Sequence, residues 1–565
     1  MAPTSILQDQ LERQRRKAEE SDAKRRAELL KLPYLDVISA QTPMDIKALG
    51  LLTREEATKG LIVPVQVNQQ TLSVVAFSPT RPEAKAALTR LGKSYTVRLF
   101  VASKVGIDHL LSYYDYVGTG DHEISGRVEI DQAHLAEIQV SVKSLTDLER
   151  AIHEFKSPLT SHVLEIVLGG SFALRASDIH MEPSEDVSTL RFRIDGLLHT
   201  VVGDLSKHIY QAAVTRIKLL STMKLNIHDE AQDGRFTISL TDRDVEVRTS
   251  VIPSEFGETV VMRLLDPLSL TVELASLGWR ADDLAIAREE IKKPNGLILN
   301  TGPTGSGKTT TLYAFLKYAW RPEIKIITIE DPIEYHLDGI SQTQTDEDAH
   351  YTFASGLRSI LRQDPNMILV GEIRDQETAE IAMNAALTGH IVFSTLHTND
   401  AVGAVPRLID LGVKPQVLGP ALSLVIAQRL VRELCPACRK PRTLGSAELV
   451  AMATFVGELP NRVVKAPYAN PTVFEPVGCT TCGGIGYRGR ISIFELFVVN
   501  ESIEQAIYKN PTELELKALA KQQGMTTMQE DGALKVLQGV TSFTEVERLT
   551  GPIPWLPEGL RPKQV

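Results

Sequence analysis

Apolar and polar positions follow different patterns along the first half of the chain. Residues 1–33 are rich in Glu, Lys, Arg and Gln with few apolar positions, which predicts a charged N-terminal helix. The apolar segments LIVPVQV and LSVVAFS then precede the helical pattern EAKAALTRL, so we predict a small α/β domain over 34–125. The polar, Gly-rich run GTGDHEISG, residues 118–126, leads into a predicted linker over 126–156, with a largely polar helical segment around 143–155.

The pattern of apolar and polar positions after residue 156 predicts two further regions. Segments TLRFRIDG and DVEVRTSVI alternate apolar and polar residues, as strands of a sheet with one open face do, and we predict a second domain over 157–275. The region 276–565 contains several apolar strands and ends in helical patterns over 500–550, such as TELELKALAKQQG. The sequence therefore predicts an α/β protein of several domains.

Composition narrows the class of protein. The chain has 565 residues, 43% of them hydrophobic and 5% aromatic, which suits three or four globular domains. Its formal net charge of −10 gives no general attraction for nucleic acid, so no nucleic-acid partner is expected. No apolar stretch approaches the ~20 residues that cross a bilayer, and the N-terminus lacks the apolar core of a signal peptide. We expect a cytoplasmic protein whose membrane contacts, if any, are peripheral.

The segment GLILNTGPTGSGKTTTLYAFL predicts a phosphate-binding loop between a strand and a helix. It matches G-x-x-x-x-G-K-[ST], in which backbone N–H groups and a helix N-terminus surround phosphate oxygens. Lys308 is predicted to reach the β- and γ-phosphates of ATP and Thr309 to bind Mg²⁺. The predicted nucleotide-binding residues are Gly302, Pro303, Thr304, Gly305, Ser306, Gly307, Lys308, Thr309 and Thr310.

Polar side chains follow three more apolar strands. The strand NMILVG delivers Glu372, KIITIEDPIEY releases Glu330, Asp331 and Glu334, and HIVFSTLHTND leads to His397. The carboxyl ends of parallel strands meet at the edge where ligands bind. One carboxylate can help to hold the metal ion while another orients the attacking water, so the pattern predicts hydrolysis as well as binding. His397 is a candidate sensor of the γ-phosphate.

All four cysteines form two C-x-x-C pairs. Cys435 and Cys438 are separated from Cys479 and Cys482 by 40 residues, Arg439 to Gly478. Four thiolates satisfy the tetrahedral preference of Zn²⁺ and leave no open position, which predicts a structural zinc site. The alternatives are free buried thiols and a redox-active C-x-x-C.

These motifs together resemble a known family. The segments GPTGSGKTT, ITIEDPIEY, LRQDPNMILVGEIRDQETA and TGHIVFSTLHTNDA resemble the Walker A, Asp box, Walker B and His box of secretion-superfamily ATPases. The group most similar powers type II secretion and type IV pilus assembly, and the resemblance covers roughly 155–550. It implies a RecA-like ATPase core, preceded by a PAS-like domain, with a tetracysteine metal-binding subdomain over 430–495. It also favours assembly over pilus retraction, because retraction ATPases lack that element.

The resemblance also assigns roles to residues. It makes Glu334 and Glu372 essential for hydrolysis and gives His397 the His-box position. The family's phosphate-approaching arginines fall on Arg248 and Arg263, with Arg407 a weaker candidate. It implies a homo-hexamer that acts on an inner-membrane platform protein and on an adaptor, which docks the small domain over 34–125.

Three functions remain in competition. The leading hypothesis is a ring ATPase that drives pilin or pseudopilin assembly, with ATP, Mg²⁺ and Zn²⁺ as cofactors. The alternatives are an ATP-driven nucleic-acid translocase and a nucleotide-gated scaffold whose hydrolysis is incidental. The acidic balance and the scarcity of aromatic residues for base stacking speak against the translocase.

Overall fold

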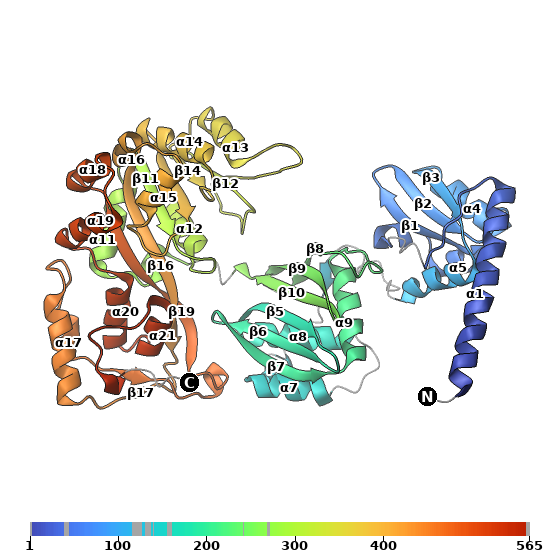
Figure 1. Ribbon diagram of the computed structural model, residues 1–565, viewed down its shortest axis with the longest axis horizontal. Coiled ribbons are helices and arrows are strands. Elements are labelled where there is room, and N and C mark those ends of the chain that lie inside the picture. Colours follow the sequence, from blue (N-terminus) through green and yellow to red (C-terminus); the bar gives the residue numbers. More distant parts are fainter. Residues whose placement is uncertain are drawn as a thin grey trace. The chain divides into compact units, whose positions relative to one another are not determined.

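The computed structural model divides the chain into two units, Met1–Asp266 and Pro267–Val565, and each is described by itself (Figure 1). It describes residues 3–38, 44–115, 127–129, 137–138, 140–154, 161–240, 242–267 and 272–560. The Gly-rich run 118–126 therefore lies outside the described residues. Within the described part, no helix combines the length and the apolar character needed to cross a bilayer.

The first unit begins with a long charged helix and a small α/β domain. Helix α1 spans Pro3–Leu30, and the domain contains β1 (Ile62–Asn68), β2 (Thr71–Ala76) and β3 (Thr96–Val101) with helices α2 (Ile46–Leu49), α3 (Arg54–Gly60), α4 (Pro82–Leu91) and α5 (Lys104–Ser112). Strand β2 pairs antiparallel with β1 and parallel with β3. Arg26 of α1 donates to the carbonyl of Phe77 at 2.6 Å, so the charged helix is anchored to this domain.

The rest of the first unit is a sheet with one open face. Its strands are β4 (Arg127–Glu129), β5 (Ala176–Pro183), β6 (Ser188–Ile194), β7 (Leu197–Leu205), β8 (Gln232–Ser239), β9 (Asp244–Ser254) and β10 (Gly257–Leu265), in the order β4-β8-β9-β10-β5-β6-β7. Helices α7 (Leu145–Glu154), α8 (Ser161–Ala173) and α9 (Lys207–Leu220) complete the domain. Buried and less buried residues alternate along β6 and β9, as predicted. Strand β4 and helix α7 come from the segment expected to be a linker, so part of 126–156 is folded.

The second unit is built on a 7-stranded sheet. Its strands are β11 (Gly296–Thr301), β12 (Ile326–Glu330), β13 (Ser341–Gln344), β14 (Met367–Val370), β15 (Ile391–Leu396), β16 (Leu422–Leu434) and β19 (Tyr487–Val498), in the order β13-β12-β14-β15-β11-β16-β19. All neighbours are parallel except β16 and β19. The central strands β11 and β15 are buried throughout, which explains their continuous apolar runs.

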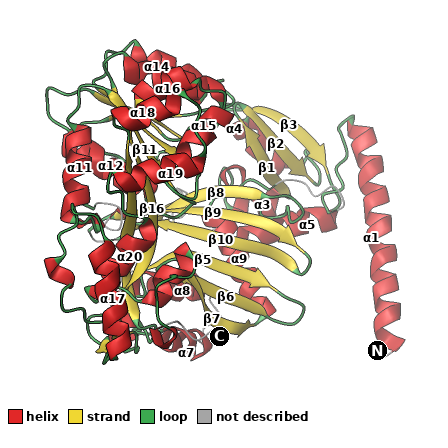
Figure 2. Ribbon diagram, turned by 60° about the vertical axis from the view of Figure 1, so that its left-hand side comes forward, coloured by secondary structure: helices red, strands yellow, loops and turns green. Residues whose placement is uncertain are grey.

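Helices cover both faces of this sheet (Figure 2). Alternate residues of β11 divide between two cores, with Leu297 and Leu299 in one and Ile298 in the other. The helices α13 (Phe353–Leu361), α14 (Gln376–Leu387), α15 (Ala404–Asp410) and α16 (Pro415–Ala421) contribute to the first core, and α12 (Lys308–Ala319) and α11 (Ala281–Ile291) to the second. This is a parallel sheet enclosed by helices.

An excursion and a helical tail complete the unit. Between β16 and β19 lie α17 (Ser446–Glu458), the short strands β17 (Lys440–Pro441) and β18 (Phe474–Glu475), and the 3₁₀ turn η4 (Thr480–Cys482). The tail contains α18 (Glu501–Tyr508), α19 (Glu513–Gln522), α20 (Met528–Leu537) and α21 (Phe543–Thr550). Phe455 of α17 and Leu534 of α20 belong to one core cluster, so the excursion and the tail fold together.

Candidate active site

The Gly-rich loop connects the end of β11 to the start of α12, as predicted. Gly302, Gly305 and Gly307 have φ values of +148°, +80° and +89°, a region of backbone conformation that residues other than glycine rarely adopt. A Cβ on Gly302 would lie 2.6 Å from the carbonyl oxygen of Gln428, and one on Gly307 would lie 2.8 Å from its Nε2. Gly302 and Gly307 are therefore required both by backbone conformation and by the close approach of β16, and Gly305 by backbone conformation alone.

A buried network of polar side chains connects the elements on either side of the loop. Gln428 Oε1 accepts hydrogen bonds from Asn300 Nδ2 at 2.9 Å and Thr311 Oγ1 at 2.8 Å, and its Nε2 donates to Ser492 Oγ at 3.0 Å. These side chains are almost fully buried. One amide thus joins the strand before the loop, the helix after it and the neighbouring strands β16 and β19. Gln428 is not among the predicted site residues, because only the pairing of β16 with β11 shows that its side chain lies beneath the phosphate loop.

The loop also has the chemistry of an anion site. Lys308 Nζ donates to the carbonyls of Gly302 at 2.7 Å and Pro303 at 3.2 Å. Burial lowers the pKa of Lys308, the charge of Arg429 acts in the same direction, and Glu372 opposes them. Ser306 Oγ is buried and has no hydrogen-bond partner among the described residues. A partly desolvated ammonium and an unsatisfied hydroxyl fit the phosphate groups of a nucleotide, and Thr309 follows at the helix start where Mg²⁺ is expected.

Three strand ends meet beside this loop. Glu372 follows β14, and its carboxylate forms an ion pair with Arg374 and lies 3.6 Å from Nε2 of His397, which follows β15. Arg374 also lies 3.8 Å from Asp331, which follows β12. The structure thus brings Glu372, His397 and Asp331 together through an arginine that the sequence analysis did not select. The only signal for Arg374 was its place two residues after Glu372.

The environment keeps His397 uncharged at neutral pH. Burial lowers the pKa of His397, the charge of Lys308 lowers it further, and Glu372 acts in the opposite direction. A neutral imidazole beside a carboxylate can accept or donate one hydrogen bond. His397 is also tied to the phosphate loop through its neighbour, because Thr398 N–H donates to Thr301 Oγ1 at 2.8 Å.

The carboxylates after β12 occupy different environments. Glu330 is buried and accepts hydrogen bonds from Thr328, Tyr313 and Gln342. Burial raises the pKa of Glu330, and the nearby charge of Glu334 acts in the same direction. Glu330 is therefore held by its neighbours inside the fold, whereas Glu334 lies partly exposed four residues further along the loop. Of the two, Glu334 is the more exposed to solvent.

The predicted arginines lie side by side on the open face of the first unit's sheet. In the strand register Arg248 is opposite Arg263 and Arg235, and Arg263 is opposite Asp178. Asp178 is buried, and its carboxylate contacts Arg263 Nε at 2.9 Å and Arg193 Nε at 3.3 Å. Four strands therefore present arginines in one row, of which the sequence analysis selected two. Arg407 is an exposed residue of α15.

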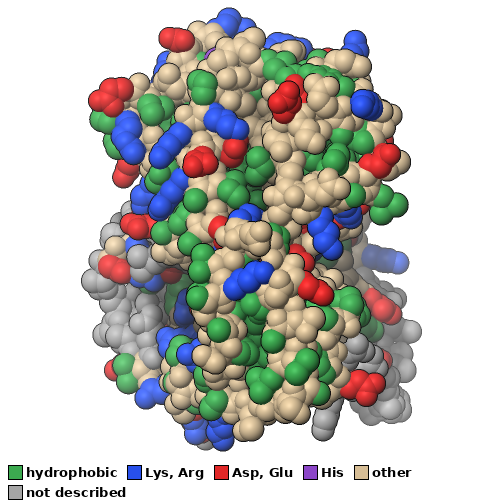
Figure 3. All heavy atoms as spheres, turned by 90° about the vertical axis from the view of Figure 1, so that its left-hand side faces the viewer, with side chains coloured by type: hydrophobic (Ala, Val, Ile, Leu, Met, Phe, Trp, Pro, Cys, Tyr) green, Lys and Arg blue, Asp and Glu red, His purple; other side chains and the backbone are tan. Residues whose placement is uncertain are grey.

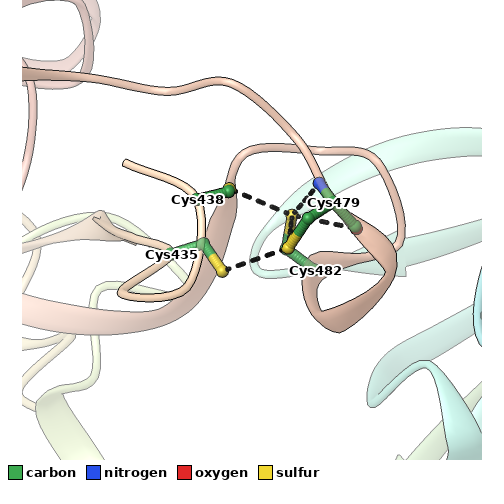
Figure 4. Close-up of side chains that lie close together, drawn as sticks. All are labelled: Cys435, Cys438, Cys479 and Cys482. Carbon is green, nitrogen blue, oxygen red and sulfur yellow. Dashed lines mark hydrogen bonds between the residues drawn. The ribbon is translucent and has the colours of Figure 1, made fainter. Parts of the chain in front are cut away.

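The four cysteine sulfurs converge from two loops (Figure 4). Cys435 and Cys438 follow β16, and Cys479 and Cys482 flank the turn before β19. The Sγ–Sγ distances are 3.9 Å for Cys435–Cys479, and 3.8 Å for both Cys438–Cys482 and Cys479–Cys482. Four sulfurs around a tetrahedral zinc at ~2.3 Å would be ~3.8 Å apart, whereas a disulfide needs ~2.05 Å.

Backbone groups complete this centre. The N–H groups of Gly478, Cys479 and Gly486 donate to cysteine sulfurs at 3.2–3.3 Å. Backbone donors, that of Cys482 foremost, lower the pKa of Cys479 to about 6, whereas burial raises the pKa of Cys435 and Cys438. The geometry fits a closed metal site. The identity of the metal as zinc stays a prediction.

Comparisons with known proteins identify the family of the chain. The family model described as "Type II/IV secretion system protein" matches residues 128–548, and the MshEN domain model matches 30–120. The chain is 46% identical to the type II secretion system protein E of Aeromonas hydrophila over 69% of its length and 75% of the relative's. It is 38% identical to the type IV pilus assembly ATPase PilB of Myxococcus xanthus over 89% and 86% of the two chains.

A solved structure supports the fold. The Legionella pneumophila ATPase DotB superimposes with a TM-score of 0.51 at 21% identity, over 70% of this chain and 97% of that chain. The predicted fold class, an α/β protein with a RecA-like ATPase core, is confirmed.

Proposed function

Since the chain belongs to the type II/IV secretion system protein family, we propose that it is the ATPase motor of a type II secretion or type IV pilus system, driving pilin or pseudopilin assembly. The proposal rests on one observation. Lys308, Glu372 and His397 lie close together, just after the carboxyl ends of the adjacent strands β11, β14 and β15. A phosphate loop alone binds nucleotide. A carboxylate and a neutral histidine beside it provide groups for hydrolysis.

The residues would divide the work as follows. Lys308 and the N–H groups of the loop hold the phosphates of ATP, and Thr309 holds the accompanying Mg²⁺, which supplies charge stabilisation for the transferred phosphoryl group. Glu372, freed from Arg374, helps to hold the ion or its water, and Glu334 orients or deprotonates the attacking water. Neutral His397 lies 3.6 Å from Glu372 and so reports on the occupant of the site.

We extend the proposal to Arg248 and Arg263 as phosphate-binding arginines. Their adjacency on one face supports it, since two guanidinium groups in register can bind phosphate oxygens together. Arg263→Ala should lower kcat for ATP at least tenfold. Arg191→Ala is the matched control, because Arg191 also pairs with a carboxylate, that of Glu182, but lies two strands away from β10 on the same sheet. Equal effects of the two substitutions would remove Arg263 from the proposal.

The assembly is also part of the proposal. We propose a cytoplasmic homo-hexamer that contacts the inner membrane through a platform protein and an adaptor, with the 34–125 domain as the adaptor's docking site. The relatives' membership of secretion and pilus machines supports this. Sedimentation of the full chain with and without ATP tests the hexamer, and a monomer under both conditions would contradict it.

Hydrolysis is tested by three substitutions in the full chain. Lys308→Ala should abolish nucleotide binding, whereas Glu372→Gln should bind ATP but lower hydrolysis by at least a hundredfold. Glu377→Gln is the control, because Glu377 forms an exposed pair with Arg358. If Glu372→Gln left pilin or pseudopilin assembly intact, the nucleotide-gated scaffold would replace the motor.

The nucleic-acid translocase is the weaker alternative. On the face drawn in Figure 3, acidic side chains lie among the basic ones, so that face does not offer the continuous basic tract that a nucleic-acid backbone needs. Stimulation of ATPase activity by DNA, but not by the platform protein, would favour this alternative.

The metal centre is proposed to bind one Zn²⁺ per protomer in a structural role. The four thiol groups leave no position for water or substrate, so the ion would stabilise the excursion between β16 and β19. Metal analysis of the purified chain checks the stoichiometry.

A further inference from the structure

A buried carboxylate on β19 joins the segment after His397 to the C-terminal helices. Glu495 is 5% exposed. Its Oε1 accepts the backbone N–H of Ala401 at 2.9 Å, and its Oε2 accepts that of Met528, the first residue of α20, at 3.2 Å. Ala401 lies four residues after His397. Both oxygens are thus used to connect two loops that are distant in sequence.

This carboxylate is costly to the fold. None of the described lysines, arginines or histidines forms an ion pair with Glu495, although burying a charge without a counter-ion is unfavourable. Burial raises its pKa to about 6, the charge of Asp400 acts in the same direction, and Lys517 opposes it. An apolar residue would remove this cost but would leave both backbone N–H groups without an acceptor. The two backbone donors therefore point to a role in holding the loops.

The same segment is held at two further points. Thr398 Oγ1 and Thr301 Oγ1 are 2.7 Å apart, so the segment is fixed to the end of β11 just before the phosphate loop. Asp400 forms an ion pair at 2.8 Å with Lys517 of α19. Residues 397–401, here called the His397 segment, are therefore held from the phosphate loop on one side and from α19 and α20 on the other.

We propose that Glu495 is a positioning residue that sets the His397 segment against the nucleotide site, and that the C-terminal helices control ATP hydrolysis through it. The inference rests on the proposed function, in which His397 reports on the site. It gives the C-terminal helices a role in activity, although they carry no residue of the site itself. A partner that moved α20 would act on hydrolysis through Glu495.

The test compares Glu495→Gln with a matched buried carboxylate. Glutamine keeps the shape but turns a donor toward one of the two N–H groups, which breaks one hydrogen bond. Glu545→Gln is the control: Glu545 is also buried and accepts the backbone N–H of Arg432 at 3.2 Å, but it is paired with Arg432 and Arg548. Two quantities are measured in the full chain: steady-state ATPase kinetics, and hydrogen exchange of the peptide that contains Ala401.

The expected result is specific to Glu495. Its substitution should lower kcat roughly tenfold with KM unchanged, and should speed exchange at Ala401 by a similar factor, since one hydrogen bond is lost. Glu545→Gln should change neither. In a His397→Ala background Glu495→Gln should have no further effect on kcat, because both act through one segment. Lys517→Met should give a smaller change in the same direction.

Other outcomes overturn the inference or the proposed function separately. If exchange at Ala401 is unchanged in Glu495→Gln, or if the Glu545 control loses as much kcat, Glu495 has only a structural role. Additive effects of Glu495→Gln and His397→Ala would also reject it. If His397→Ala alone leaves kcat unchanged, the proposed role of His397 fails, and unchanged kcat in Glu495→Gln then rejects the inference as well.

Discussion

Substituting Asp531 with Asn tests the ion network that joins the C-terminal helices to the ATPase core. Asp531 Oδ1 accepts from Arg280 Nη1 at 2.9 Å, and Oδ2 accepts from Lys535 Nζ at 2.5 Å and from the backbone N–H of Phe494 at 2.8 Å. The side chains of Asp531, Arg280 and Lys535 are 1%, 7% and 6% exposed. Neutralising the carboxylate removes the one ionic partner that Lys535 has among the described residues, and it weakens the hold on Arg280.

The cost of this substitution can be worked from these contacts. Removing one partner of a buried ion pair costs ~3–5 kcal/mol. Asn retains one acceptor oxygen, and Arg280 keeps its contacts with Asp282 and Asp283, so we expect the lower end, about 3 kcal/mol. At roughly 2 °C per kcal/mol for a unit of this size, the Tm should fall by about 6 °C.

The assay follows from the positions of the tryptophans. All three, Trp279, Trp320 and Trp555, belong to the second unit, so tryptophan fluorescence reports unfolding of that unit alone. Trp279 stacks on Phe494 at 3.6 Å, next to the substituted group. Glu377→Gln, which breaks an exposed pair, is the control and should change Tm by less than 2 °C. Equal shifts in the two variants would refute the network's contribution.

Three further predictions concern the phosphate loop, Glu495 and the metal centre. Gly307→Val should lower nucleotide affinity at least tenfold by fluorescence titration, because its Cβ would meet Gln428, whereas Gly457→Ala, with open space around it, should bind normally. For Glu495 the folded pKa is raised to about 6 from 4.5, so the folded state binds the extra proton. The stability of the wild type relative to Glu495→Gln should therefore be greatest below pH 4.5 and fall by about 2 kcal/mol as pH rises through 6. The groups that act on Glu495 are Asp400 and Lys517, and denaturant titrations at pH 5 and pH 8 measure the difference; an equal gap at both pH values would contradict it. Removing the metal with a chelator should lower the Tm of the second unit, and Cys438→Ser should abolish that sensitivity together with the bound metal.

Several features of the molecule were predictable because they are local in the chain. The phosphate loop was predicted from glycines at fixed spacing between an apolar strand and a helix, and the structure shows positive φ at these glycines. Spacing alone also paired the cysteines within each C-x-x-C, and the structure brings the two pairs together. The open-faced sheet followed from period-two alternation in segments such as TLRFRIDG.

The predicted linker shows that contacts between distant segments cannot be predicted from local sequence. Residues 126–156 look polar, and nothing in their composition predicts that β4 pairs with β8 or that α7 packs beside α8. Arg374, Gln428 and Glu495 were missed for the same reason. Each is an ordinary polar residue in the sequence, and each gains its role only from a neighbour more than 20 residues away or on another strand.

The sequence by itself determined the elements and the chemistry they can perform: a phosphate loop, carboxylates and a histidine after apolar strands, and four thiol ligands. Only the tertiary structure decided which of these groups meet. Strand order places β14 between β12 and β15, so Asp331, Glu372 and His397 converge, and antiparallel pairing of β16 with β19 brings Glu495 to the His397 segment. The physical reason is that periodicity along a chain specifies secondary structure, whereas adjacency between strands depends on the packing of the whole core.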